Sequence, residues 1–221
     1  MPNIITQKTP FCQTRRFRQN DDGGGNEGGG GYNGGIMADK RFDFNALPLA
    51  GAFVADIRRM GDARGVFARM FCAREFGDVG FSGRIEQISI AESTKKGTLR
   101  GMHYQLPPKA EAKIVSVIRG AVWDVVLDLR PSSATFGKYA AAELSADNGK
   151  MMCIPKGCAH GYLTLADDTQ LAYLIDEYHA PDLERGIRWD DPAFAIDWPF
   201  APKVMSARDK GFADFSPKTH L

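Results

Sequence analysis

A group of charged side chains lies in the stretch TLRGMHYQLPPKAEAKI, residues 98–114. Arg100, His103 and Lys113 stand there among residues that otherwise favour two short strands interrupted by a pair of prolines. The net charge of the chain is only +1, so no global field attracts an anion, and an anionic ligand must be held by a local pocket. These three residues are the first candidates to line such a pocket.

Strand periodicity gives these side chains a direction. Alternation places His103 and Gln105 on one face of the first strand, and Lys113, Val115 and Val117 on one face of the second. An inward Lys113 can meet His103 inside the fold, where it needs a counter-charge or an anionic ligand. The pattern equally allows an outward Lys113, and His103 taken alone can be a structural histidine.

A second motif, IPKGCAHGYLTL, carries Pro155, Gly157 and His160 as P-x-G-x-x-H, which resembles the second motif of the cupin superfamily. Metal-binding cupins also carry H-x-H followed by Glu, but here the corresponding residues are His103 and Gln105, with Glu111 further on. Glutamine is a poor substitute for imidazole as a transition-metal ligand, so the site lacks part of a metal-binding set.

The elements that must position these residues are short strands. Period-two alternation and regular turn residues, without long helical periodicity, predict an all-β fold, either sandwich or barrel, and the jelly roll is the version whose open mouth holds a small ligand. A hairpin is expected at Gly120, and helical turns only in SARDKGFADF. The clearest strands are RIEQISIAE, KIVSVIRG, AVWDVVLDLR, YAAAEL, KMMCIP and LAYLIDEY.

Composition limits the functional classes. The near-neutral chain offers no global attraction for nucleic acid or an anionic membrane, and no apolar run reaches the roughly 18 residues of a membrane span. The four cysteines, Cys12, Cys72, Cys153 and Cys158, have no zinc or CxxC spacing and suit a reduced protein. We therefore expect a cytoplasmic protein that binds neither nucleic acid nor membrane.

Residues 1–40 differ from the rest, because DDGGGNEGGGGYNGG has almost nothing to bury and follows the basic QTRRFRQ. We expect a disordered glycine-rich tail and one folded domain over residues 41–221. The arginines could also bind an acidic partner or belong to a transit peptide, and Met37 could be the true start. A chain starting at Met37 is expected to fold and turn over like the full one.

Seven blocks give the chain a family resemblance. In order they are GDARGVF, TLRGMHYQ, KIVSVIRGAVWDVVLDLR, TFGKY, IPKGCAHGYLTL, ERGIRWDDPAFAIDWP and SARD, and together they resemble the dTDP-4-dehydrorhamnose 3,5-epimerase family over residues 47–210. The resemblance implies a metal-free cupin jelly-roll barrel with short C-terminal helical turns, no cofactor, and a homodimer. It also implies an isomerase that epimerises a nucleotide-linked 4-keto-6-deoxy sugar, with dTDP as the expected nucleotide, at C3, C5 or both, in rhamnose-type deoxysugar biosynthesis.

The same resemblance implies the catalytic roles. His103 is the base that removes the proton beside the C4 ketone, and Asp209 in SARD orients its imidazole. Lys113 stabilises the enolate, and Tyr173 returns a proton from the opposite face. Asp190 and Asp191 are rivals to Asp209, although an aspartate before proline is often only a turn former.

Other residues match family positions that hold the substrate. Guanidinium groups suit phosphate oxygens, so an arginine-rich set is expected around the diphosphate. The set comprises Arg64, Phe67, Gln87, Arg100, His160, Glu184 and Arg208, with Phe67 and Gln87 near the nucleobase. Arg69, Ser89 and His179 depart from residues common in the family, which leaves the nucleotide base and the sugar open.

Two other functions stay open at this level. A metal-dependent cupin oxygenase would use His103, Glu111 and His160 as ligands. A non-catalytic sugar-nucleotide binding module would need none of the proton-transfer groups, whereas this chain carries the complete set of histidine, lysine, tyrosine and aspartate.

The resemblance also implies that an N-terminal strand region packs across the dimer, so that Arg64 or Phe67 completes the partner's site.

Overall fold

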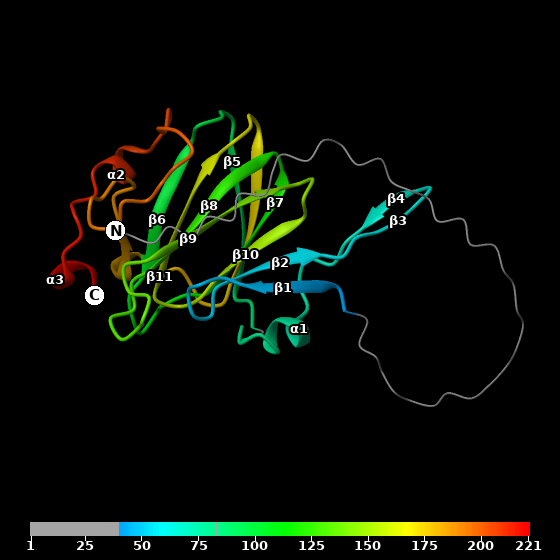
Figure 1. Cartoon of the computed structure of the whole chain (residues 1–221), viewed down its shortest axis with the longest axis horizontal. Helices are drawn as coiled ribbons and strands as arrows, with labels where there is room; N and C mark the ends of the chain where they lie inside the picture. Colours follow the sequence, from blue (N-terminus) through cyan, green and yellow to red (C-terminus); the bar gives the residue numbers. More distant parts are fainter. Residues whose placement is uncertain (1–39, 83) are drawn as a thin grey trace, which may run out of the picture.

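The computed structural model describes residues 40–82 and 84–221, and in it two antiparallel sheets face one another as a flattened barrel (Figure 1). The first sheet has the strand order β1-β2-β10-β7-β12-β5. Its strands are β1 (Phe42–Ala46), β2 (Phe53–Ile57), β10 (Lys150–Ile154), β7 (Lys113–Arg119), β12 (Thr169–Ile175) and β5 (Gln87–Ser93). Strands β1 and β5 are therefore the two edges of this sheet.

The second sheet has the order β13-β6-β11-β8-β9. Its strands are β13 (Glu184–Gly186), β6 (Leu99–Gln105), β11 (Cys158–Thr164), β8 (Ala121–Asp128) and β9 (Tyr139–Ser145). A separate hairpin is formed by β3 (Met60–Asp62) and β4 (Gly65–Phe67). The helices are α1 (Ala73–Gly77), α2 (Ala207–Lys210), α3 (Pro217–His220) and the 3₁₀ turn Pro181–Leu183.

The main core fills the space between the sheets. Inward residues of β7 and β8, among them Val115, Val117, Val122 and Val126, pack there with Tyr162 of β11. The β-branched side chains suit this position, because they pack well on a pleated surface. The core occupies one end of the interior and leaves the other to polar side chains.

Both sheets also bury part of their outer faces. Trp123, Val125 and Leu127 of β8 lie beneath the C-terminal segment that contains Phe194 and Trp198. Phe76 of α1 is fully buried against the outer face of the first sheet. Strand β8 is therefore covered on both faces, which explains its nearly continuous apolar sequence.

The prediction of a hairpin at Gly120 is wrong. Strands β7 and β8 follow one another directly, but they belong to different sheets, and Gly120 marks the corner between them with a φ of 79°. A Cβ at this position would lie 2.4 Å from the hydroxyl oxygen of Thr169, so the corner also needs the small residue. Two β-rich segments that meet at a glycine look alike in sequence whether they pair or separate.

The other fold expectations have mixed outcomes. The all-β class and the jelly-roll architecture are confirmed, and SARDKGFADF forms the single helical turn α2. Helix α1 was not expected. The tail up to residue 39, with Cys12 and Met37, lies outside the described residues. Within residues 40–82 and 84–221, the other three cysteines are free, and no helix is long and apolar enough to span a bilayer.

Candidate active site

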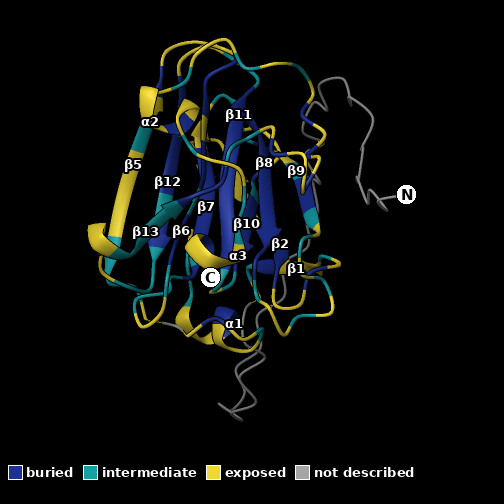
Figure 2. Ribbon diagram, turned by 90° about the vertical axis from the view of Figure 1, so that its left-hand side faces the viewer, coloured by how far each residue is buried: buried dark blue, intermediate teal, exposed yellow. Residues whose placement is uncertain are grey.

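A cavity of about 470 Å³ opens between the two sheets beside the edge strand β5. Figure 2 shows β5 as an exposed strand next to the buried strands of the barrel. Side chains from six strands and two loops converge there. The lining residues are Gln87, Ser89, Ala91, Arg100, His103, Glu111, Lys113, His160, Tyr162, Tyr173, Ile175, His179 and Glu184.

His103 is held by an aspartate from a distant part of the chain. Its Nε2 lies 2.8 Å from Oδ1 of Asp209, and Asp209 Oδ2 accepts a bond from the backbone N–H of Gly101. Ser206 caps α2 by accepting from the backbone N–H of Asp209. Burial raises the pKa of the Asp209 carboxyl, but hydrogen bonding and the charge of His103 outweigh it and hold that pKa below its usual value. The carboxylate holds one ring nitrogen and leaves the other to accept a proton.

Arg100 and His103 share the cavity because of a bulge. They are three positions apart, and on a regular strand they would face opposite sides. The register between β6 and β11 shifts here, so that two residues of β6 oppose Gly161 alone. A Cβ on Gly101, whose φ is 120°, would lie 2.5 Å from the Cα of Gly161, so the close approach requires glycine.

Lys113 points into the cavity and is paired. Its Nζ lies 2.6 Å from Oε1 of Glu111, and both side chains are largely buried. Glu111, two residues earlier in the chain, therefore supplies the counter-charge that an inward lysine requires. The pair keeps a cation on the β7 wall of the cavity, in the sheet that faces β6 and His103.

His160 lies deeper, at the floor. Its Nε2 is 2.9 Å from Oδ2 of Asp124, a fully buried carboxyl of β8. Burial raises the pKa of Asp124, and the contact with His160 partly offsets that effect. The His160 ring meets Tyr173 edge to face, with centroids 6.0 Å apart, so this pair supports the tyrosine.

Tyr173 comes from β12, on the wall opposite His103. It faces into the barrel next to Val115 of β7. Burial raises its pKa well above the usual value, so the phenol is protonated at neutral pH and has a proton to give. The cavity thus holds a histidine and a protonated tyrosine on different sheets.

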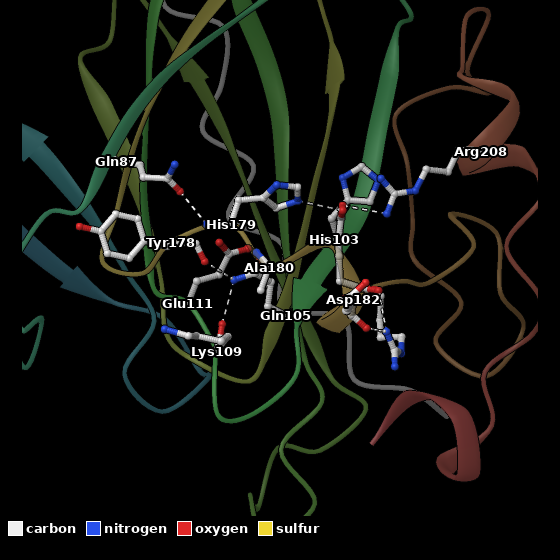
Figure 3. A network of polar contacts seen from close by, with 12 residues as sticks. Gln87, His103, Gln105, Lys109, Glu111, Tyr178, His179, Ala180, Asp182 and Arg208 are labelled. Atoms are coloured by element: carbon white, nitrogen blue, oxygen red, sulfur yellow. Dashed lines mark hydrogen bonds and ion pairs between the residues drawn. The ribbon is translucent and has the colours of Figure 1, made fainter.

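A charged network closes one side of the mouth (Figure 3). Glu184 bridges two partners: Oε2 lies 3.1 Å from Nε2 of His179, and Oε1 lies 2.9 Å from Nη2 of Arg208. Burial raises the pKa of Glu184, but the hydrogen bonds from Arg208 and His179 outweigh it and hold the pKa below its usual value. Gln87 accepts from the backbone N–H of His179 and joins this network to β5.

Arg64 and Phe67 do not reach this cavity. Both lie on the β3–β4 hairpin, which extends away from the barrel (Figure 1). The Arg64 guanidinium is paired with Asp62, its neighbour in the hairpin, and Phe67 is 65% exposed. Within one chain, the structure separates these two from the other candidate substrate-binding residues.

The rivals of Asp209 have other partners. Asp191 accepts from the backbone N–H groups of Ala193 and Phe215, and so fixes a turn and the C-terminal segment. Asp190 pairs with Arg188. Neither pairing involves His103.

The sequence analysis did not identify several residues that the structure places at the site. Phe212 packs edge to face on His103 and lies so close to Gly186 that a Cβ there would clash with its ring. Asp124, the partner of His160, is hidden in an apolar strand. The Glu111–Lys113 pair left a signal, because residues two positions apart share a strand face.

The three proposed metal ligands also have other partners. His103 contacts Asp209, Glu111 contacts Lys113, and His160 contacts Asp124. Among the residues that the structure describes, no group of three or more His, Cys, Asp or Glu side chains is arranged to hold a metal ion. The donor set therefore does not fit the cupin oxygenase alternative.

Comparisons with known proteins agree on one family. The family model described as dTDP-4-dehydrorhamnose 3,5-epimerase matches residues 46–216. A protein of that name from Sinorhizobium fredii (strain NBRC 101917 / NGR234) is 39% identical over 181 residues, which cover 80% of this chain and 90% of the relative.

Solved structures agree as well. The dTDP-4-dehydrorhamnose 3,5-epimerase of Elizabethkingia anophelis NUHP1 has a TM-score of 0.77 and 31% identity, covering 82% of this chain and 100% of that chain. The enzyme of the same name from Bacillus anthracis str. Ames, with TDP and PPi bound, has a TM-score of 0.76 and 34% identity, covering 79% and 99%.

Proposed function

This chain belongs to the dTDP-4-dehydrorhamnose 3,5-epimerase family, and from that premise we propose that it epimerises a dTDP-linked 4-keto-6-deoxy sugar in deoxysugar biosynthesis. The observation that carries the proposal is the cavity itself, where the His103–Asp209 pair and Tyr173 stand on different sheets. The thymidine diphosphate bound to the Bacillus anthracis relative supports the choice of nucleotide.

The reaction begins with proton removal. A hydrogen on the carbon beside a ketone is acidic because the electrons left behind are shared with the ketone oxygen. His103 takes that proton on the ring nitrogen that Asp209 leaves free, and the ionised carboxylate stabilises the imidazolium that forms. The negative charge then resides on the former ketone oxygen.

A fixed cation stabilises this enolate. Lys113 supplies it, and Glu111 holds the ammonium in place before the substrate arrives, so little reorganisation is needed when charge develops. Arg100, which the bulge brings into the same cavity as His103, holds the diphosphate together with Arg208 at the mouth, where Glu184 positions the Arg208 guanidinium.

Reprotonation completes the inversion. Tyr173 gives its phenolic proton to the carbon from the face opposite His103, and proton exchange with solvent later restores both groups. His160, supported by Asp124, packs against the Tyr173 ring and keeps it aimed at the sugar. A base and an acid on opposite walls are the minimum that inversion at carbon requires.

Solvent proton exchange is the sharpest test of this function. In deuterated water, with dTDP-4-keto-6-deoxyglucose, we expect deuterium to enter C3, C5 or both, together with product of inverted configuration. Nuclear magnetic resonance of the sugar reports which carbon exchanges. Parallel reactions with UDP- and GDP-linked 4-keto sugars are expected to be slower, and wild-type protein that neither exchanges nor inverts the dTDP sugar would refute the function.

We also infer a cytoplasmic homodimer in which the β3–β4 hairpin of each chain reaches the partner's cavity. Val66 and Phe67 expose large apolar surface on the hairpin, as Ile88 and Ile90 do on the outward face of β5. The alternate residues of β5 line the cavity, so a hairpin docked on this edge lies next to the site. Arg64 and Phe67 would then complete the partner's substrate pocket.

Replacing Ile88 and Ile90 together with Asp should separate the dimer. Both side chains are exposed, 71% and 61%, so the barrel is expected to fold, while two buried charges would oppose association. Sedimentation should report a monomer, and kcat/KM should fall at least about tenfold because Arg64 and Phe67 no longer reach the site. The matched control is Val204→Asp. Val204 is also an exposed apolar residue, but it lies beside Thr98, just before β6 of the second sheet, so this variant should stay dimeric. A fully active monomer would contradict the exchange of hairpins.

A further inference from the structure

Tyr162 carries a buried hydroxyl that lacks a well-formed hydrogen bond. The residue is 1% exposed, lies in β11 within the main core, and lines the cavity. Its Oη is one of three buried side-chain polar atoms without a hydrogen-bond partner among the described residues. A hydroxyl in such a place costs free energy that a phenylalanine would not cost. An unsatisfied group that lines a candidate active site points to a partner that forms during the reaction.

The nearest reacting group is Tyr173. Tyr173 packs against the same core cluster as Tyr162, and both line the cavity. Burial raises the pKa of each tyrosine, and the two hydroxyls are close enough that each also changes the pKa of the other. The Arg100 guanidinium also acts on both tyrosines, and it donates to the Ser93 hydroxyl at 3.4 Å. The two phenols therefore form a pair across the cavity, Tyr162 from β11 of one sheet and Tyr173 from β12 of the other.

We infer that Tyr162 is a positioning residue for the general acid, an inference that rests on the role proposed above for Tyr173. When Tyr173 gives its proton to the substrate carbon, a phenolate remains in a site where burial opposes charge. The Tyr162 hydroxyl donates a hydrogen bond to that phenolate oxygen, and no covalent bond of Tyr162 breaks. Tyr173 regains its proton from solvent after the product leaves. In the resting protein the Tyr162 hydroxyl thus lies near the Ser93 and Tyr173 hydroxyls without a well-formed hydrogen bond, and it gains one after proton transfer.

Tyr162→Phe tests this role, because it removes the hydroxyl and keeps the ring. The rate of inversion, measured as kcat, is expected to fall about ten- to a hundredfold, as for the loss of one hydrogen bond to a charged group. Deuterium exchange on the His103 side and KM should stay near the wild-type values, since binding and proton removal do not use this hydroxyl. In the double variant with Tyr173→Phe, inversion should fall no further than in Tyr173→Phe alone.

Stability provides an independent reading. Because the Tyr162 hydroxyl has no good partner in the resting protein, Tyr162→Phe is expected to melt at the same temperature as the wild type or slightly higher. The matched control is Tyr104→Phe. The Tyr104 hydroxyl is also buried, but it donates to the carbonyl of His220 at 2.7 Å, and Tyr104 does not line the cavity. That variant should melt at a lower temperature with an unchanged kcat.

Three outcomes would overturn the inference. Inversion at the wild-type rate in Tyr162→Phe would show that the hydroxyl has no role. A raised KM with unchanged kcat would make it a substrate contact. Equal losses of exchange and inversion, with a lower melting temperature, would make it structural. Each is distinct from failure of the proposed function, which would appear as wild-type protein that neither exchanges nor inverts the dTDP sugar.

Discussion

Replacement of His103 by Asn should stop proton exchange at C3 and C5 of the 4-keto sugar. Asn can still hydrogen bond to the Asp209 carboxylate but cannot take a proton at neutral pH, so the first step fails. Exchange and inversion are both expected to fall by about 10² to 10⁴. Nuclear magnetic resonance in deuterated water measures exchange, and product analysis measures inversion.

The binding and folding of this variant should be nearly normal. Arg100 and Lys113 are unchanged, so dTDP should bind to His103→Asn with close to wild-type affinity in calorimetry. The change leaves only a small volume unfilled, so the melting temperature should be retained. His220→Asn, at a histidine outside the cavity, is the control and should exchange at the wild-type rate. If His103→Asn exchanged protons nearly as fast as the wild type, His103 would not be the base.

Tyr173→Phe should fail at the other step. Burial raises the pKa of the Tyr173 phenol well above its usual value, so in the wild type the phenol is protonated at neutral pH and can act as a proton donor. Without the hydroxyl, His103 can still withdraw a proton and return it from the same side. Deuterium should therefore enter the substrate at a substantial rate, whereas inverted product should fall about 10² to 10⁴.

The contrast between the two variants is the informative result. Loss of the hydroxyl opens no large cavity, and the ring keeps its contact with His160, so Tyr173→Phe should keep the wild-type melting profile. Tyr178→Phe, at an exposed tyrosine near the mouth, is the matched control and should retain both exchange and inversion. If Tyr173→Phe inverted the sugar at the wild-type rate, the proton would have to come from another group.

Local sequence patterns determined much of the barrel. Period-two alternation and regular turn residues predicted six of the strands, because side-chain direction in a strand depends only on whether a position is odd or even. The same rule placed Lys113 on a face with Val115 and Val117, which is the inward face of β7. The same rule could have identified Glu111 as the counter-charge of Lys113, because the two residues are two positions apart.

Pairing between strands was beyond these patterns. Gly120 was expected to close a hairpin, yet it turns the chain from one sheet to the other. A glycine permits both conformations, and the choice is made by what β7 and β8 find to pack against, namely β10 and β12 for one and β9 and β11 for the other. Such contacts are distant in sequence and leave no periodic signal.

The catalytic geometry depended most on tertiary structure. Strict alternation would send Arg100 and His103 to opposite faces, and only the bulge against Gly161 brings both to the cavity. Asp209 lies 106 residues from His103, so no local spacing could join them, and the family resemblance alone predicted that pair. The sequence by itself determined the elements and the chemical groups, because these depend on residue type and period. The tertiary structure decided which groups meet, because that depends on sheet pairing, a register shift and the packing of α2.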